Sequence, residues 1–491
     1  DALFSCFQER GLSESMKKEH PSSLVMNFVY NVAYQIMNIF LPLVTVPYVS
    51  RVLGAEKLGI YSYTYAIASY FAIVAYLGFE NYGNRMIARN RENREKLDQT
   101  FSGAYYFQLI SGFCACGAYV FYLLFFCRQN RNMAFLQLLY IVSQMVNISW
   151  LYFGLEKFKK TALRSMSVKL LSTAAIFVFV KGPGNITEYT LICAGSALLG
   201  SGCLWINLHK SVSFVKVSLR EIFIHAKGCM ILFFPVLIIN IYRSMDKIML
   251  GQLADMKEVA VYSNADKIVE LPYGIIAALG VVMLPRMTSF VSSGEVEKSR
   301  KYIEKSMRFM MFLACGMAFG MMAVGRVFAP VFFGDEFISC GDLIMTIAPM
   351  VIIRACANVV RTQYLLPNNR DKDYMISLII GVIINLTVNW GLIPILKSQG
   401  AAIGTLMAES FVAIYQIAVC RKEIPVIRYT LQNWFFLIAG AVMFFIVFLL
   451  GNNQKPSVVL LIVQICTGGI LYILLAGGYL LKNRKVRKDC E

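Results

Sequence analysis

Charged side chains occur inside long apolar stretches, where they are costly to bury. Arg354 and Arg361 stand seven residues apart, which is two turns of a helix, so both side chains face the same way. A charge at the centre of a bilayer costs about 2.5–3.5 kcal/mol or more, so such residues are rarely idle. The planar fork of a guanidinium group can grip two oxygens of one phosphate. The pair therefore predicts a binding site for a molecule that carries phosphate.

Two neighbouring apolar stretches carry six more charges: Arg243, Asp246, Lys247, Asp266, Lys267 and Glu270. We expect Arg243 to bind substrate together with the two arginines above, and the other five charges to serve ion coupling or gating. The alternative is structural. Arg243 can pair with Asp246, and Lys267 with Glu270, each three positions along its own helix, so that these charges pin helices together.

Uncharged polar residues form a stripe on the first apolar stretch. Asn31, Gln35 and Asn38 share one helical face, and we expect them to bind substrate. Further amides stand in later stretches: Gln144, Asn147, Asn385 and Asn389. Amides suit sugar hydroxyls, but they are also ordinary contacts between membrane helices, so both interpretations stay open for these residues.

The amino-acid composition indicates that much of this chain is surrounded by lipid. Its 491 residues are 57% hydrophobic and 15% charged, whereas soluble domains are about 45–50% apolar and about 25% charged. The net charge of +18 would suit nucleic acid, but the basic residues are spread over loops between apolar runs. The 13 cysteines lie mostly in apolar stretches, and the 3 histidines lack metal-ligand spacing. We expect a membrane protein with no metal, no cofactor and no nucleic-acid partner.

Apolar stretches of about 20 residues, the length that crosses a bilayer as a helix, recur along the chain. They lie near 25–49, 58–79, 101–126, 133–154, 162–180, 186–208, 229–250, 260–284, 303–325, 343–364, 374–395, 401–420, 430–450 and 457–481. With the N-terminus in the cytoplasm, most of the 47 Lys and Arg fall in inner loops, as the positive-inside rule requires. The sequence therefore predicts an all-α protein with about fourteen transmembrane helices and both termini in the cytoplasm.

The first two stretches are echoed 197 residues later, counting from Gly54 to Gly251. Residues 53–54 and 59–62 match residues 250–251 and 260–263. Both copies begin on a helix that runs the same way, so we expect two six-helix lobes related by a parallel pseudo-two-fold axis. The expected parts are an N-terminal segment 1–24, an N-lobe 25–208, a linker 209–228, a C-lobe 229–425, helices 13 and 14 at 426–481, and a basic tail 482–491.

Two segments of this repeat resemble the polysaccharide biosynthesis flippases of the Wzx type, which move O-antigen or capsule repeat units. The first comprises residues 27–31, 47–54 and 59–63, and the second comprises residues 246–251, 261–268 and 271–272. The resemblance extends over nearly all of the chain from about residue 24. These flippases belong to the multidrug/oligosaccharidyl-lipid/polysaccharide exporter superfamily, which implies a MATE-like fold with alternating access.

The resemblance also implies a function. The expected substrate is an undecaprenyl-diphosphate-linked oligosaccharide, moved through a cationic cavity in the bacterial cytoplasmic membrane and coupled to H⁺ or Na⁺. Expected partners are membrane lipids and the polymerase and chain-length proteins of the same pathway. Asp246 and Lys247 lie in a family motif, whereas the arginines rest on the residue argument alone. The alternatives are a multidrug or lipid II exporter of the same superfamily, and a membrane polymerase or glycosyltransferase.

Overall fold

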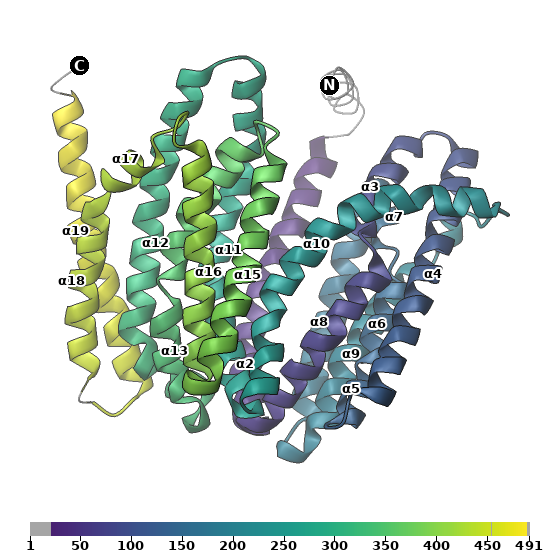
Figure 1. Cartoon of the computed structure of the whole chain (residues 1–491), viewed down its shortest axis with the longest axis horizontal. Helices are drawn as coiled ribbons and strands as arrows, with labels where there is room; N and C mark the ends of the chain where they lie inside the picture. Colours follow the sequence, from purple (N-terminus) through teal and green to yellow (C-terminus); the bar gives the residue numbers. More distant parts are fainter. Residues whose placement is uncertain (1–20, 453, 489–491) are drawn as a thin grey trace.

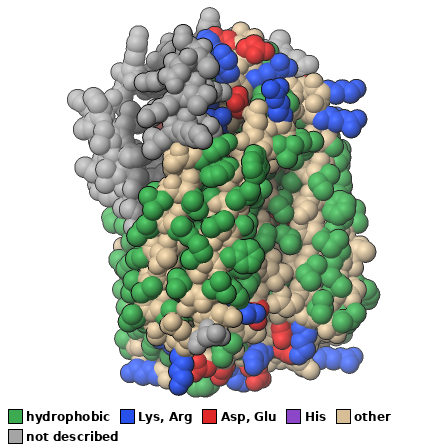
Figure 2. Space-filling view, turned by 90° about the vertical axis from the view of Figure 1, so that its left-hand side faces the viewer, with side chains coloured by type: hydrophobic (Ala, Val, Ile, Leu, Met, Phe, Trp, Pro, Cys, Tyr) green, Lys and Arg blue, Asp and Glu red, His purple; other side chains and the backbone are tan. Residues whose placement is uncertain are grey.

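Helices joined by short loops and turns form the described chain, residues 21–452 and 454–488 of the computed structural model, and no strand occurs in that part. Side chains are described for residue 37 and for residues 40–480 except 158–160 and 453. On the face shown in Figure 2, apolar side chains cover a broad band, and charged side chains gather above and below it. This distribution is that of a protein whose middle faces lipid.

Eight α-helices and three short 3₁₀ turns form the N-lobe, on the right of Figure 1. They are α2 (Pro21–Tyr76), α3 (Phe79–Asn90), α4 (Arg94–Phe125), α5 (Arg131–Leu136), α6 (Leu138–Met145), α7 (Ser149–Gly154), α8 (Phe158–Phe179), η1 (Pro183–Asn185), α9 (Ile186–Gly202), η2 (Cys203–Trp205) and η3 (Leu208–Lys210). The fourth expected span, 133–154, is thus divided into three pieces rather than being one continuous helix.

The long helix α2 contains two crossings of the membrane. Gly54 has φ 75° and ψ 170°, which interrupts the helix, and such a positive φ is a conformation that glycine adopts without a side-chain penalty. The chain reverses direction there. The turn of the second repeat lies between α10 and α11, where Asp255 caps the next helix by accepting from the N–H of Glu258 at 3.0 Å.

The C-lobe and the final helices complete the bundle. The C-lobe comprises α10 (Leu219–Leu253), α11 (Met256–Ser292), α12 (Val296–Phe333), η4 (Asp335–Phe337), α13 (Ser339–Ile347), α14 (Met350–Val360), the π-helical turn η5 (Arg361–Leu365), α15 (Asp371–Leu396) and α16 (Ser398–Cys420). The short α17 (Val426–Leu431) and the long α18 (Trp434–Gly451) and α19 (Val458–Lys488) follow.

Two expected boundaries shift in the structure. Ser218 and Glu221 form a capping box, so α10 begins at Leu219 and takes up the second half of the expected linker. This first part of α10 crosses over the N-lobe before the helix turns down into the C-lobe (Figure 1). The backbone of the expected basic tail continues α19 as far as Lys488.

Twelve stretches of the described chain are long and apolar enough to cross a membrane. One of them, Phe40–Asn90, spans the turn at Gly54 and so belongs to two crossings, while α9 is only 17 residues long. The expected fourteen crossings are therefore present. The helix α2 begins, and α19 ends, at the same end of the bundle (Figure 1); we call it the proximal end, and the opposite end, which contains Gly54, the distal end.

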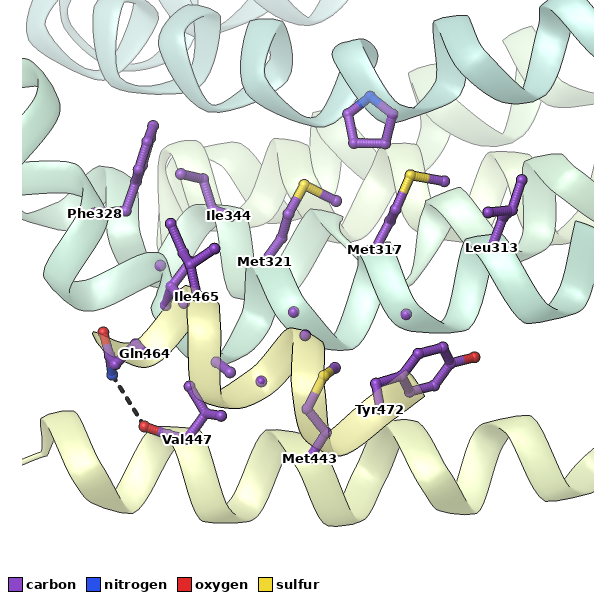
Figure 3. A pocket seen from close by; sticks show the side chains of 18 of the residues that line it. Leu313, Met317, Met321, Phe328, Ile344, Met443, Val447, Gln464, Ile465 and Tyr472 are labelled. Carbon is purple, nitrogen blue, oxygen red and sulfur yellow. Dashed lines mark hydrogen bonds between the residues drawn. The ribbon is translucent and has the colours of Figure 1, made fainter. Parts of the chain in front are cut away.

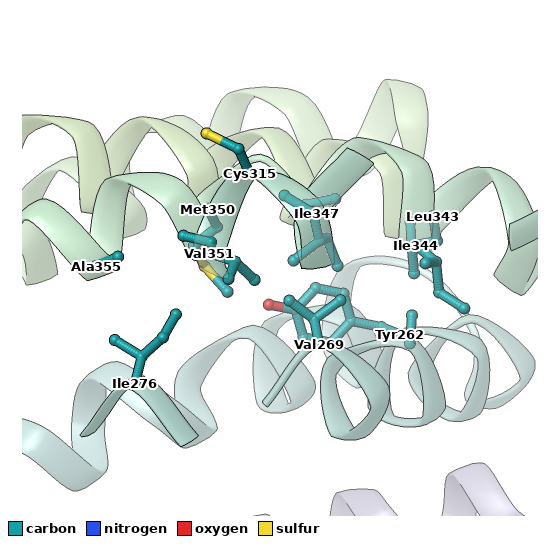
Figure 4. Packing of buried hydrophobic residues seen from close by; sticks show 14 of the residues in the cluster. Tyr262, Val269, Ile276, Cys315, Leu343, Ile344, Ile347, Met350, Val351 and Ala355 are labelled. Carbon is teal, nitrogen blue, oxygen red and sulfur yellow. The ribbon is translucent and has the colours of Figure 1, made fainter. Parts of the chain in front are cut away.

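A large hydrophobic core cluster includes many buried side chains of the C-lobe. Figure 4 shows side chains of α11 facing those of α13 and α14, with Val269 and Ile276 on one side and Ile347 and Val351 on the other. All four are at most 1% exposed. This dry contact fixes α11 and α14 relative to each other, and both helices carry the charged residues described below.

Candidate functional site

Arg354 on α14 is the centre of an ion triad inside the C-lobe. Its Nε donates to Oε1 of Glu409 on α16 at 2.7 Å, and its Nη1 donates to Oε1 of Glu270 on α11. The guanidinium carbon also lies 5.1 Å from the ring centre of Tyr273. Only 11% of the Arg354 side chain is exposed. Three helices are therefore joined through one buried cation, an arrangement that is costly to break on one side only.

A second polar centre surrounds Asp246 on α10. Its Oδ2 accepts from the hydroxyls of Tyr262 at 2.6 Å and Thr405 at 3.0 Å. Its Oδ1 accepts from the amides of Asn385 at 3.0 Å and Asn389 at 2.6 Å. Four side chains from three other helices thus point at one buried carboxylate. Asn385 and Asn389 therefore donate hydrogen bonds to this carboxylate. Of the two interpretations that the sequence left open for them, the structure supports contacts between helices.

The first cavity, which we call the distal cavity, lies between the two lobes and measures about 290 Å³. The N-lobe contributes uncharged residues such as Tyr65, Ser69 and Tyr140. The C-lobe contributes all the charged lining residues, which are Arg243, Asp246, Lys247, Asp266, Glu270 and Arg354. Three positive and three negative groups give this cavity no net formal charge.

The second cavity, which we call the proximal cavity, measures about 160 Å³ and is lined by C-lobe residues alone. Its charged lining residues are Arg243, Arg354, Arg361 and Glu409. The excess of two positive charges makes it the more cationic of the two cavities. Arg361 donates to the hydroxyl of Tyr374 at 3.2 Å and also lies over its ring. Arg243 and Arg354 line both cavities and form the boundary between them.

An apolar groove of about 550 Å³ opens on the other side of α11, between α12, α13, α18 and α19 (Figure 3). Met317, Met321 and Phe328 from α12 and Ile465 and Tyr472 from α19 lie along it. Residues of one helix reach both surfaces: Ile268 and Pro272 line the groove, whereas Asp266 and Glu270 line the distal cavity. This alternation follows from the helical period, because positions two apart point in roughly opposite directions.

The structure brings most of the expected charges together but pairs them differently. Neither expected pair within one helix occurs among the described residues. Lys247 pairs instead with Asp266 at 3.2 Å across α10 and α11, and Glu270 pairs with Arg354. Lys267 is exposed and lies outside the linings of both cavities. The backbones of Asn31, Gln35 and Asn38 lie in α2, but their side chains fall outside the described part.

Sequence reasoning missed several residues of the two cavities. The sequence places Glu409 among the acidic residues of the apolar stretches, but not its pairing with Arg354, which completes the triad. Tyr262 and Thr405, which complete the shell of Asp246, were not expected in the site. Asn358, Gln416 and Tyr242 line the proximal cavity. One signal was available: Asn358 stands four residues after Arg354 and three before Arg361, so it shares their helical face.

Two protein-family models match this chain. The family model "Polysaccharide biosynthesis protein" matches residues 24–291, more than half of the chain. A second model, "Lipid II flippase MurJ", matches residues 202–465. The chain is thus a multi-pass transporter protein with a flippase fold. It belongs to the polysaccharide biosynthesis protein family, as a Wzx-type member of the multidrug/oligosaccharidyl-lipid/polysaccharide exporter superfamily.

Relatives and solved structures agree with this assignment. An Escherichia coli (strain K12) protein described as "Putative O-antigen transporter" is 23% identical over 82% of this chain and 97% of its own length. A protein of Shigella dysenteriae with the same description is 21% identical over 77% and 96%. Among solved structures, a lipid II flippase MurJ in an inward closed conformation has a TM-score of 0.71, with 13% identity, over 93% of this chain and 99% of that one. An inward-facing MATE family transporter has a TM-score of 0.64, with 14% identity, over 82% and 99%. These likenesses confirm the MATE-like fold.

Proposed function

We propose that this protein moves undecaprenyl-diphosphate-linked oligosaccharides across the bacterial cytoplasmic membrane, by alternating access, for the synthesis of a surface polysaccharide. The observation that carries the proposal is the pair of adjoining cavities, in which three arginines gather at membrane depth inside a transporter fold. Such charges are costly there unless an anionic group uses them. The family and the O-antigen relatives support a lipid-linked sugar as the substrate.

In this proposal the arginines receive the diphosphate. Arg243 is exposed and lines both cavities, and none of the described carboxylates lies within ion-pair distance of it. It therefore makes the first contact. Arg354 follows by exchanging Glu270 or Glu409 for a phosphate oxygen, since a guanidinium fork accepts either anion. Arg361 supplies a further positive group at the proximal side. Asn31, Gln35 and Asn38 on α2 remain proposed contacts to the sugars.

In this proposal the acidic residues act after substrate release, while the empty transporter returns to its starting conformation. Asp246, with its shell of hydroxyl and amide groups, has the oxygen chemistry to hold H⁺ or Na⁺ in exchange for these hydrogen bonds. Lys247 and Asp266 pair beside it across α10 and α11 and gate access. Lys267 follows Asp266 on α11, on an exposed face outside both cavities, and remains a proposed gating residue. Glu270 takes Arg354 back after the phosphate leaves. Coupling to an ion gradient then acts through α10, which carries both Arg243 and Asp246.

The lipid part of the substrate stays among lipids. The apolar groove beside α11 faces the band of apolar surface and is lined almost entirely by hydrocarbon and thioether side chains. A prenyl chain can lie there while its diphosphate stays on the other side of the same helix. The proximal end then faces the cytoplasm, in agreement with the distribution of Lys and Arg over the loops.

The proposal is tested by deleting the gene in its host and resolving lipid-linked oligosaccharides by membrane leaflet. We expect complete repeat units to accumulate on the inner leaflet, and the wild-type gene to release them to the cell surface. Single repeat units that reach the outer leaflet without being joined would point to a polymerase instead. Units found there in normal amount and fully polymerised would remove the protein from export.

Lipid II is the second candidate substrate, because the MurJ model matches residues 202–465. The two substrates share the undecaprenyl diphosphate and differ in the sugars. Purified protein in vesicles that contain either lipid separates them. We expect the surface-polysaccharide unit to cross and lipid II to stay; the reverse result would make the protein a lipid II flippase.

A further inference from the structure

The proximal cavity contains buried polar atoms that have no hydrogen-bond partner among the described residues. Asn358 is 2% exposed, and both its Oδ1 and its Nδ2 lack a partner. Gln416 is also 2% exposed, and its Oε1 lacks a partner, although its Nε2 donates to Ser377 at 3.0 Å. The hydroxyl of Tyr242 and Nε of Arg361 lack partners as well. All of these residues line the same cavity.

Such atoms are unusual, because leaving a buried donor or acceptor unsatisfied costs about 1–3 kcal/mol. The group that satisfies them can be deduced from donors and acceptors. A phosphate at neutral pH offers almost only acceptors, so it suits the free N–H of Arg361 but not the amide oxygens of Asn358 and Gln416. Those oxygens need donors. A group with both hydroxyl or amide donors and oxygen acceptors fits the whole set.

The positions of Arg354, Asn358 and Arg361 along the helix indicate which part of the ligand carries these donors and acceptors. Arg354, Asn358 and Arg361 occupy positions i, i+4 and i+7 of α14 and the turn that follows, so the amide lies between two guanidinium groups. A ligand that places phosphate on an arginine here presents its neighbouring group to Asn358. In a sugar diphosphate, that neighbour is the first sugar.

We infer that Asn358 and Gln416 form a subsite for the sugar directly attached to the diphosphate. This inference rests on the proposed function and adds to it a specificity-determining pair that reads hydroxyl or acetamido groups. Gly280 on α11 makes the space: a Cβ there would lie 2.5 Å from Oδ1 of Asn358. The subsite lies wholly within the C-lobe, so it moves as one body while the lobes alternate.

The test compares two probes in vesicles that contain the purified full chain: the lipid-linked oligosaccharide that accumulates in the deletion host, and undecaprenyl diphosphate without sugar. Asn358→Leu and Gln416→Met keep the size of each side chain and remove the amide. We expect each variant to flip the oligosaccharide about 3- to 10-fold more slowly than wild type, which is the loss of one neutral hydrogen bond. Flipping of undecaprenyl diphosphate should stay unchanged.

Gln363→Met is the matched control. Gln363 is fully buried with both amide atoms unpartnered, but it lies outside the lining of the proximal cavity, so its substitution should change neither probe. If Asn358→Leu slows both probes equally, or slows neither, the proposed sugar subsite is overturned. The amides would then be explained as hydrogen-bonding partners of bound water. A wild-type protein that flips neither probe would refute the proposed function instead. Thermal unfolding of each variant checks that it is folded.

Discussion

Two buried amides, one in each lobe, differ in whether their polar atoms have hydrogen-bond partners. In the N-lobe, Gln108 on α4 is fully buried and fully satisfied: Nε2 donates to the carbonyls of Gln144, Met145 and Asn147 at 2.9–3.1 Å, and Oε1 accepts from the indole of Trp150 at 2.8 Å. In the C-lobe, Asn358 is equally buried, and neither end of its amide has a partner. The satisfied amide holds helices together, whereas the unsatisfied amide of Asn358 lines a cavity and is free to bind a ligand.

Charges follow the same division. Two ion pairs of the N-lobe, Arg91–Glu156 and Arg94–Asp98, lie near helix ends at the proximal side. The triad around Arg354 lies in the middle of the C-lobe helices. The two lobes therefore share the arrangement of their helices but not the placement of their charges, and in the proposed function the C-lobe is the half that binds substrate.

The first prediction concerns the ion triad of the C-lobe. Arg354→Ala alone would leave two carboxylates unpaired, at a cost of about 3–5 kcal/mol, so lost export would not distinguish binding from folding. The triple change Arg354→Met, Glu270→Gln, Glu409→Gln removes all three charges together. We expect this variant to fold and its export to fall at least about tenfold, since charged hydrogen bonds contribute about 1.5–3 kcal/mol each. Glycan export per folded molecule is the measurement.

A matched control for the triad is available at the distal surface. Arg326 and Asp342 pair at 2.6 Å, and about half of each side chain is exposed. Arg326→Met with Asp342→Asn should leave export unchanged. Wild-type export by the triple variant would mean that the triad only ties helices together, and the contrast between the lobes would then be one of packing.

The second prediction concerns the satisfied amide of the N-lobe. Gln108→Leu leaves three carbonyls and an indole N–H without their partner, so we expect a loss of about 2 kcal/mol or more in the free energy of unfolding. Asn358→Leu loses no hydrogen bond within the protein and should change that free energy by less than about 1 kcal/mol. Denaturant unfolding in detergent measures both. Similar losses for the two variants would contradict the distinction between a structural and a ligand-binding amide.

The sequence predicts the helix count, the common end of the termini and the residues that carry charge. These follow from hydrophobic length and from the cost of charge in lipid, which are local properties. The hydrogen-bond and ion-pair partners of these charged residues could not be predicted in the same way. Asp246 is held by Asn385, Asn389 and Thr405, all more than 130 residues away, and spacing along one helix cannot indicate which neighbour faces it. The same limit applies to Glu409, whose charge within an apolar stretch is visible in the sequence but whose pairing with Arg354 depends on tertiary packing.

The third prediction concerns Asp246. Asp246→Asn keeps the shape of the side chain and removes its charge, so the proposed H⁺ or Na⁺ can no longer be held. We expect flipping in vesicles to continue at a reduced rate and to lose its response to an imposed pH or Na⁺ gradient. Asp98→Asn, in the N-lobe, should keep the response. A gradient response that survives in Asp246→Asn would place ion coupling elsewhere.

The smallest effect is expected where the lobes meet at the distal end. Oε2 of Glu336 accepts from the N–H of Ala55 at 2.7 Å, directly after the turn at Gly54, so a C-lobe carboxylate caps an N-lobe helix. A carboxylate at a helix N-terminus contributes about 0.3–1 kcal/mol. Asn264 also donates across the lobes to Ser50 at 3.0 Å. Alternating access requires these contacts to break when the distal end opens.

Glu336→Gln removes the charge and keeps the size, so it should shift the balance toward the distally open form by up to about fivefold. Spin labels on the distal ends of the two lobes would register this as a larger fraction of long distances. Asp335→Asn, beside it and without a described hydrogen bond to the N-lobe, should leave the distances unchanged. Because the cap joins the lobes without touching either cavity, Glu336→Gln should alter the distribution of conformations while leaving binding of the diphosphate unchanged. A change in both would mean that the closed distal end is itself part of the C-lobe site, and the division between a supporting lobe and a substrate-handling lobe would have to be withdrawn.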